Sequence, residues 1–320
     1  MILEVKNLCV DYIQKNKTAT ALYNVSFSLE RGEILGVVGE SGCGKTTLML
    51  ALLRLLPQAG KISNGQVLYE NKDILQLDDK AMAELRWDEI SIVFQGAMNA
   101  LNPVRTIGDQ IAEAIRRHEK LSKEATRKRV EELLELVGIS KGRRDQYPHQ
   151  YSGGMRQRAM IAMALACYPK IIIADEPTTA LDVMIQAQIL ELLADLRDKL
   201  GLAVIFVTHD LGVVAELCDS VLVLYAGVTA EYADVDTLFN LPQHPYTQRL
   251  LAAFPNLENP KALESIPGYP PRLDDLPKGC RFAPRCNKAF ERCQHELPKL
   301  YQVNPWQHSS CFLTQHLSTS

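Results

Sequence analysis

The sequence predicts an α/β fold with a mostly parallel sheet, an antiparallel N-terminal β-subdomain, an inserted helical subdomain and an irregular C-terminal extension rich in cysteine and proline. Three observations support this prediction. Short apolar runs alternate with helical patterns up to about residue 235, two N-terminal segments alternate in polarity, and the composition changes near residue 236. We therefore divide the 320 residues into a domain over 1–235, with its helical subdomain at about 97–165, and an extension over 236–320.

The apolar runs are short and are followed by amphipathic segments, as expected for buried parallel strands with covering helices. These predicted strands are Glu33–Gly39, Ser91–Phe94, Ile171–Asp175 and Ala203–Thr208. Between Ile107 and Gly138 the pattern is helical, because apolar residues recur on one face: Val130, Leu133, Leu134 and Val137. Ile2–Lys6 and Leu22–Leu29 alternate in polarity around a polar turn, which predicts antiparallel strands.

Composition and charge exclude several classes of protein. Eleven of the sixteen prolines lie between Pro242 and Pro305, which predicts an irregular extension. With a net charge of −3, the chain lacks the excess of basic residues that proteins binding nucleic acid carry. No apolar run approaches the roughly 20 residues that cross a bilayer, and the first residues do not form a secretory signal. We expect a cytosolic chain.

A phosphate-binding loop follows the strand Glu33–Gly39. The eight residues match the P-loop pattern, and an apolar helix pattern from Thr46 to Leu56 comes directly after them: Gly39, Glu40, Ser41, Gly42, Cys43, Gly44, Lys45 and Thr46. Backbone N–H groups of such a loop surround phosphate oxygens, Lys45 reaches the β- and γ-phosphates, and the Thr46 hydroxyl ligates Mg²⁺. The sequence thus predicts a P-loop NTPase core; a glycine-rich turn without a ligand is the alternative.

Two carboxylates end the strand Ile171–Asp175 at the sheet edge where α/β proteins bind ligands. Asp175 is the candidate that holds Mg²⁺, and Glu176 is the candidate general base for the attacking water. Helix capping is the alternative role for such a pair. The preceding P-loop makes catalysis the better interpretation.

A third motif is Ser152-Gly153-Gly154, which we call the signature segment, at the start of a helix that ends before Pro169. An ordinary serine cap with a flexible entry would have the same appearance. The order of P-loop, signature segment and acidic strand resembles the ABC ATPases over roughly residues 1–235. This resemblance implies that the signature segment of one subunit closes on ATP held by the P-loop of another.

The resemblance also implies roles for single residues. Tyr12 would stack on adenine, Gln95 would contact Mg²⁺ and the water, and His209 would contact the γ-phosphate. Asp182 would lie in a loop across the dimer interface, and Thr47 would join Thr46 in binding ATP. A surface tyrosine and a structural histidine are the alternatives at Tyr12 and His209.

Three positions depart from the usual ABC pattern. The signature is flanked by Tyr151 and Met155 where leucine and glutamine are usual, and the P-loop has Thr46 where serine is more usual. None of these changes removes a hydroxyl or glycine needed for phosphate contact. They leave open whether the two composite sites are kinetically equal.

The extension resembles that of ATPases serving oligopeptide and dipeptide permeases, on the segments His244–Thr247, Ile266–Gly268 and Gly279–Cys286. Nickel and some oligosaccharide importers share it. Four cysteines spaced C-x5-C-x6-C-x17-C differ from common zinc and ferredoxin patterns: Cys280, Cys286, Cys293 and Cys311. The resemblance implies a 4Fe–4S cluster, with zinc or metal-free thiols as alternatives.

The predicted function is therefore that of an ATPase subunit at the cytoplasmic face of a membrane. It would bind ATP and Mg²⁺ and use ATP hydrolysis to drive peptide import. The implied partners are a second ATPase subunit, two transmembrane permease subunits and, indirectly, an extracytoplasmic substrate-binding protein. A heterodimer of two different ATPase subunits is favoured, with a homodimer as the alternative. A soluble ABC ATPase acting on ribosomes or DNA is the main rival. A P-loop GTPase or kinase would leave the signature segment and His209 unexplained.

Overall fold

The computed structural model describes residues 1–14, 17–94, 96, 100–179, 181–253 and 266–319. Contacts between Cα atoms divide the chain into two compact units. Unit 1 consists of residues 1–30, 34–75 and 208–320, and unit 2 of residues 31–33 and 76–207.

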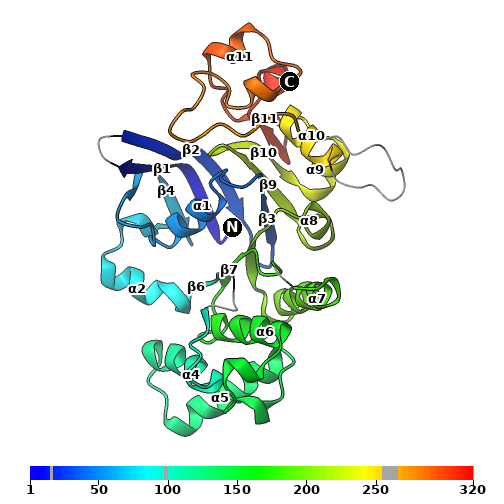
Figure 1. The fold of residues 1–320 in the computed structure, drawn as a ribbon. Helices are drawn as coiled ribbons and strands as arrows, with labels where there is room; N and C mark the ends of the chain where they lie inside the picture. The colour runs from blue at the N-terminus through cyan, green and yellow to red at the C-terminus, as the bar shows by residue number, and fades with distance from the viewer. Residues whose placement is uncertain (15–16, 95, 97–99, 180, 254–265, 320) are drawn as a thin grey trace. The chain divides into compact units, whose positions relative to one another are not determined.

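Unit 1 begins with a four-stranded antiparallel sheet in the order β2-β1-β4-β5, drawn in blue to cyan in Figure 1. Its strands are β1 (Leu3–Gln14), β2 (Lys17–Leu29), β4 (Gly60–Tyr69) and β5 (Lys72–Asp73). β1 pairs with both β2 and β4, and β4 pairs with β5. The predicted antiparallel N-terminal subdomain is confirmed, with strands longer than the alternating segments suggested.

A second set of strands in unit 1 is ordered β11-β12-β10-β9-β3. These strands are β3 (Ile34–Val38), β9 (Ser220–Tyr225), β10 (Val228–Asp234), β11 (Tyr301–Asn304) and β12 (Gln307–Ser309). β3 and β9 are parallel and wholly buried, whereas the pairs from β9 to β11 are antiparallel. The extension therefore adds two short strands to the sheet, which the proline-rich composition did not predict.

In the described part of unit 1, the helices are α1 (Lys45–Leu52), α8 (Leu211–Leu217), α9 (Val235–Asn240), α10 (Pro245–Ala252) and α11 (Glu291–His295). Three aromatic rings join the extension to β9. The ring centroids of Tyr225 and Phe282 lie 5.1 Å apart, and those of Tyr225 and Tyr246 lie 4.6 Å apart. All three rings are buried, so this contact packs the extension on the sheet.

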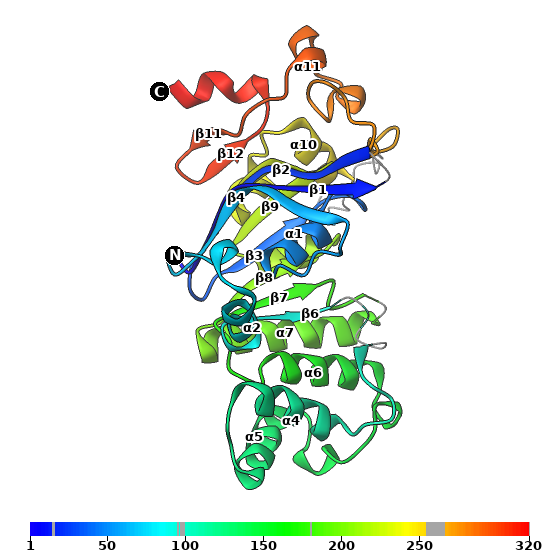
Figure 2. The ribbon, with the colours of Figure 1, turned by 90° about the vertical axis from the view of Figure 1, so that its left-hand side faces the viewer.

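Unit 2 contains three parallel strands in the order β8-β7-β6. They are β6 (Ile90–Val93), β7 (Ile171–Asp175) and β8 (Ala203–Val207), each fully buried as predicted from the apolar runs. The helices are α2 (Asp79–Asp88), α4 (Ile107–His118), α5 (Lys123–Leu136), α6 (Gly153–Ala164) and α7 (Val183–Leu200). Figure 2 shows α4, α5 and α6 grouped together, and all four apolar residues predicted for the face around Val130 are buried.

Short 3₁₀ turns complete the described secondary structure: η1 (Ile74–Gln76), η2 (Lys141–Arg143), η3 (Pro148–Gln150), η4 (Ala283–Arg285) and η5 (Phe312–Thr319). Among the residues described, no helix combines the length and the apolar character that crossing a bilayer requires.

Candidate functional site

The P-loop connects β3 to α1, as the motif predicts. Its backbone needs glycine at two places. A Cβ on Gly39 would lie 2.2 Å from the carbonyl oxygen of Leu224, at a φ of +149°. Gly44 has a φ of +108° and is the N-cap of α1, with no side-chain hydrogen bond at the cap. The helix therefore starts with backbone N–H groups that no capping side chain takes.

Lys45 places its ammonium group inside the loop. Its Nζ donates to the carbonyl oxygens of Gly39 at 2.6 Å and Glu40 at 3.2 Å, and the residue is only 8% exposed. Burial raises the pKa of the nearby Cys43 thiol, an effect that the charge of Lys45 partly offsets. The loop thus concentrates positive charge where the motif predicts phosphate.

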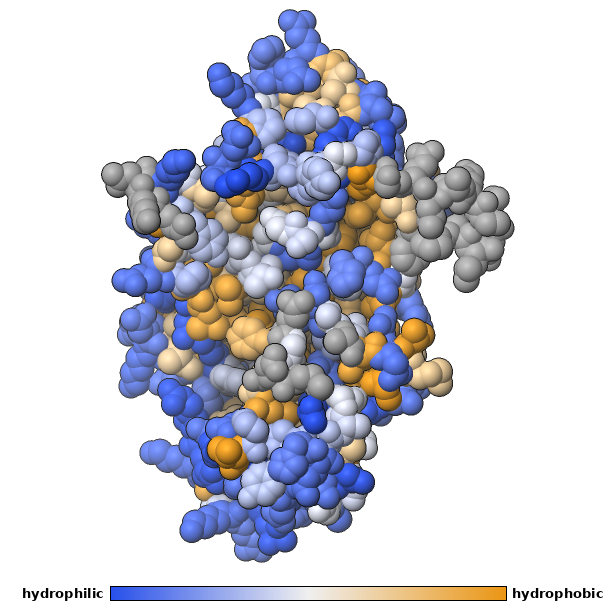
Figure 3. All heavy atoms as spheres, in the orientation of Figure 1, coloured by the Kyte–Doolittle hydropathy of each residue, from blue (hydrophilic) through white to orange (hydrophobic). Residues whose placement is uncertain are grey.

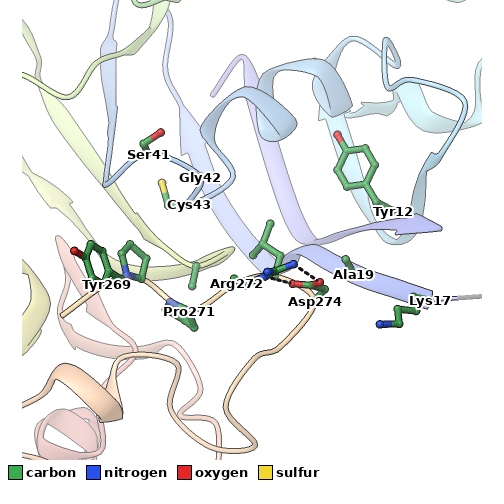
Figure 4. Close-up of a pocket in the computed structure, with 13 residues that line it drawn as sticks. Tyr12, Lys17, Ala19, Ser41, Gly42, Cys43, Tyr269, Pro271, Arg272 and Asp274 are labelled. Atoms are coloured by element: carbon green, nitrogen blue, oxygen red, sulfur yellow. Dashed lines mark hydrogen bonds and ion pairs between the residues drawn. The ribbon is translucent and has the colours of Figure 1, made fainter. Parts of the chain in front are cut away.

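Tyr12 and the P-loop line one pocket of about 890 Å³, shown in Figure 4. The loop contributes Ser41, Gly42 and Cys43, and the hydroxyl groups of Tyr12 and Thr47 lie 3.4 Å apart, within hydrogen-bond distance. This volume falls in the range of small-molecule sites. The structure therefore brings together the predicted phosphate loop and the predicted base-stacking tyrosine.

The same pocket has lining residues that were missed in the sequence: Lys17, Ala19, Ala226, Tyr269, Pro270, Pro271, Arg272, Leu273 and Asp274. Six of them form one continuous segment of the extension. The proline-rich composition marked this segment as irregular, but composition does not say which surface an irregular segment contacts.

His209 is exposed and belongs to the same unit as the P-loop. The N–H of Thr208, next to it, donates to the carbonyl oxygen of Val37 in β3 at 3.2 Å. On its other side, the carboxylate of Asp210 caps α8 by accepting from the Gly212 N–H at 2.9 Å. The segment that carries His209 is thus held beside the strand that leads into the P-loop.

In unit 2, Asp175 ends β7 and is 5% exposed. Glu176 follows with a positive φ of 46°, and its N–H donates to the carbonyl oxygen of Val207 at 2.9 Å. The Thr179 hydroxyl donates to Oε2 of Glu176 at 2.9 Å. This strained turn and its hydrogen bonds orient the carboxylate, as expected at a functional position.

The signature segment begins α6. Ser152 caps the helix, since its Oγ accepts from the Met155 N–H at 3.3 Å. A Cβ on Gly154 would lie 2.6 Å from Cγ2 of Ile185 in α7. Asp182 caps α7 by accepting from the N–H of Ile185 at 3.0 Å. The signature segment and Asp182 thus lie at one close contact between α6 and α7. Gln95 lies outside the described residues.

The four clustered cysteines line one small cavity of about 20 Å³: Cys280, Cys286, Cys293 and Cys311. The N–H of Cys280 donates to the carbonyl oxygen of Cys293 at 2.9 Å. Burial raises the pKa of Cys280 to about 11 and also raises the pKa of Cys286 and Cys311. Within the described ranges, however, no three His, Cys, Asp or Glu side chains are arranged to hold a metal ion. The donor type fits a metal centre, whereas the arrangement is not a preformed one.

Two protein families match this chain. The ABC transporter family matches residues 22–179, and the oligopeptide/dipeptide transporter C-terminal region matches residues 230–293. The first match contains the P-loop, the signature segment and the acidic pair. The second contains the first three clustered cysteines.

Curated relatives cover nearly the whole chain. A dipeptide transport ATP-binding protein of Bacillus subtilis is 50% identical over 301 residues, which are 93% of this chain and 90% of the relative. A probable peptide ABC transporter ATP-binding protein of Sinorhizobium fredii is 46% identical over 98% of this chain and 95% of its own length.

Solved structures support the fold. A dimeric ATP-binding cassette in a post-hydrolysis state, bound to ADP and Pi, matches with a TM-score of 0.65 and 32% identity. The match covers 73% of this chain and 98% of that one. The chain belongs to the ABC transporter family of ATP-binding proteins, in the group that carries the oligopeptide/dipeptide transporter C-terminal region.

Proposed function

We propose that this chain is the ATP-hydrolysing subunit that powers a membrane importer of di- and oligopeptides. The observation that carries the proposal is the pocket between Tyr12 and the P-loop, in a chain whose close relatives are named as peptide transport ATP-binding proteins. Import of nickel or an oligosaccharide by the same motor is a second candidate that the relatives do not favour. The net charge of −3 speaks against action on ribosomes or DNA.

In the proposed mechanism, the P-loop amides and Lys45 bind the β- and γ-phosphates of ATP. Thr46, Gln95 and Asp175 are the candidate ligands of Mg²⁺, which prefers such oxygen donors and neutralises phosphate charge when bound. Glu176 takes a proton from the attacking water, and His209 contacts the γ-phosphate. Hydrolysis then separates the subunits and resets the transporter.

Replacement of Glu176 by glutamine tests this function. The amide cannot accept the proton, so we expect ATP turnover to fall by about 10²- to 10⁴-fold while ATP binding persists. Asp195→Asn is a matched control, because Asp195 is an exposed carboxylate of α7 paired with Lys199 at 2.8 Å. Steady-state turnover and ATP binding are measured for both variants. Near-normal turnover of the Glu176 variant would exclude Glu176 as the general base.

We further propose that two ATP molecules are enclosed between this subunit and a similar, different one. The signature segment and Asp182 would then face the partner's nucleotide. Two apolar residues just after Asp182 support an interface there, since Val183 is 82% and Met184 is 72% exposed. Figure 3 shows further apolar side chains interrupting the polar surface on one face of the molecule.

The proposed assembly also contains two transmembrane permease subunits, with an extracytoplasmic substrate-binding protein as an indirect partner. The chain would therefore lie at the cytoplasmic face of the membrane. Affinity purification from detergent-solubilised membranes tests this arrangement. Recovery of a hydrophobic permease is expected, and reproducible recovery of ribosomes or DNA instead would contradict it.

The cysteine-lined cavity is the proposed position of a 4Fe–4S cluster, with zinc or free thiols as alternatives. Convergence of four thiols on one cavity supports a metal centre, and binding would require them to move apart because the cavity holds little more than one water. Absorption near about 400 nm, with iron and zinc analysis of anaerobically purified protein, separates the three. A colourless, iron-free sample would refute the cluster.

The domain boundaries at 1–235 and 236–320, with a helical subdomain at about 97–165, likewise stay predictions.

A further inference from the structure

One wall of the P-loop pocket comes from the C-terminal extension. Figure 4 shows the segment Tyr269–Asp274, which we call the pocket wall, running from the side of Ser41 and Cys43 towards the side of Tyr12 and Lys17. Tyr269 is 91% exposed, so its ring is accessible to a ligand in the pocket that it lines. The wall therefore presents apolar and charged groups to the same space as the P-loop.

A buried arginine holds the residues just before this wall to the P-loop. The Arg285 side chain is 4% exposed and makes a bidentate ion pair with Glu40, through contacts of 2.6 and 3.0 Å. The same guanidinium donates to the carbonyl oxygens of Pro267 at 2.9 Å and Ile266 at 3.3 Å. Because one rigid group holds both partners, the pocket wall and the phosphate loop keep a set spacing.

The charges on the wall fit an anionic ligand. Arg272 is 81% exposed at its side chain and pairs with Asp274, with Nη2 and Oδ2 2.9 Å apart. Because this ion pair is exposed to solvent, the guanidinium can exchange that carboxylate for a phosphate oxygen at little cost. A nucleotide with phosphates at the P-loop and its base at Tyr12 has its ribose and α-phosphate between these points, where the wall lies.

We propose that the C-terminal extension is part of the ATP site, with the pocket wall covering the ribose and Arg272 contacting the α-phosphate side of the nucleotide. This inference rests on the proposed function, because the ligand is the ATP which that function assigns. It gives the extension a role in nucleotide binding, separate from any role of its cysteines. The extension and the ATPase core would then bind ATP as one unit.

Limited proteolysis of the full-length protein tests the wall directly. Trypsin cleaves after exposed arginines, and Leu273 follows Arg272, so the wall contains a cleavable bond. A non-hydrolysable ATP analogue with Mg²⁺ is expected to slow cleavage after Arg272 at least fivefold, in a saturable way. Cleavage after Arg292, an exposed arginine of α11 that does not line the pocket, is expected to stay unchanged.

Calorimetric titration with the same analogue tests whether the positive charge of Arg272 contributes to nucleotide binding. Arg272→Ala is expected to weaken binding about tenfold, the effect of one charge-assisted hydrogen bond. Arg272→Lys should recover part of the affinity. Arg292→Ala is the matched control, since Arg292 is also an exposed arginine of the extension, paired with Glu296 at 2.8 Å. Thermal melting confirms that the variants fold.

The outcomes separate this inference from the proposed function. Binding lost in Lys45→Ala but unchanged in Arg272→Ala, with no protection after Arg272, would overturn the role of the pocket wall and leave the ATPase standing. A wild-type protein that binds no ATP analogue would overturn both. Protection together with weaker binding of Arg272→Ala supports the wall.

Discussion

Two helices of this chain start at glycine-bearing turns, and the glycines serve different purposes. At α1, the P-loop glycines are required by backbone geometry: Gly39 approaches the Leu224 carbonyl and Gly44 has a positive φ. At α6, Gly154 is required by a side chain, because Ile185 occupies the space that a Cβ would need. The first helix start leaves its amides without a capping side chain, whereas Ser152 caps the second.

The two predicted phosphate contacts are therefore built differently. The P-loop is shaped for an anion before any partner arrives, since its turn, its uncapped amides and Lys45 belong to one unit. The signature segment is shaped by packing within its own unit, and its serine hydroxyl is already engaged with the Met155 N–H. Because Oγ accepts in this bond, its O–H can still donate to a phosphate oxygen of the partner's ATP.

We expect the largest effect from a substitution at the first helix start. Gly39→Ala places a Cβ against a backbone carbonyl that cannot move away, so we expect a loss of about 2–4 kcal/mol in the free energy of unfolding and no measurable ATP binding. Urea denaturation and nucleotide titration measure both. Gly42→Ala is a partial control, because a Cβ there meets nothing within 4 Å although φ is +78°. Equal tolerance of both changes would contradict the backbone explanation.

A smaller effect is expected at the second helix start. Gly154→Ala should cost about 1–3 kcal/mol through overpacking against Ile185. The obstacle is a side chain, so the cost should shrink in an Ile185→Ala background, whereas no second substitution should restore Gly39→Ala. Gly153→Ala is the matched control, since its nearest neighbour, Leu181, would lie 3.7 Å away. Additive effects of the Gly154 and Ile185 changes in a double-mutant cycle would refute the packing explanation.

The smallest effect concerns the cap. Ser152→Ala removes the hydrogen bond from the Met155 N–H and should lower the free energy of unfolding by about 1 kcal/mol. If the hydroxyl also serves the partner's ATP, turnover of the assembled transporter should fall by more than this stability loss explains. Ser122→Ala, which removes an equivalent cap from α5, provides the comparison. Identical turnover of the two variants would limit Ser152 to capping.

Local patterns predicted much of the core correctly. The strands around Ile171–Asp175 and Ala203–Val207 were identified from apolar runs, because a strand buried on both faces excludes polar residues. The P-loop was identified because phosphate binding demands glycine, lysine and a hydroxyl at set spacing. The helical stretch near Val130 was recognised, but its division into α4 and α5 was not stated.

Contacts between distant residues could not be predicted in the same way. Glu40 and Arg285 are 245 positions apart, and no local sequence pattern around either residue indicates that the two side chains form an ion pair. The pairing of β12 with β10 and the course of the pocket wall along the P-loop pocket are similar cases. In each, the contact depends on how the whole chain packs.

Short motifs were enough to identify an ATPase, since residues within them are set by the chemistry of phosphate, Mg²⁺ and water. The folded chain was needed to see that the extension adds strands to the sheet and lines the pocket of the P-loop. It also showed that four thiols line one cavity, with no preformed metal site among the described residues. The physical reason is that motif chemistry is local, whereas burial, ion pairing and pocket lining are settled by long-range packing.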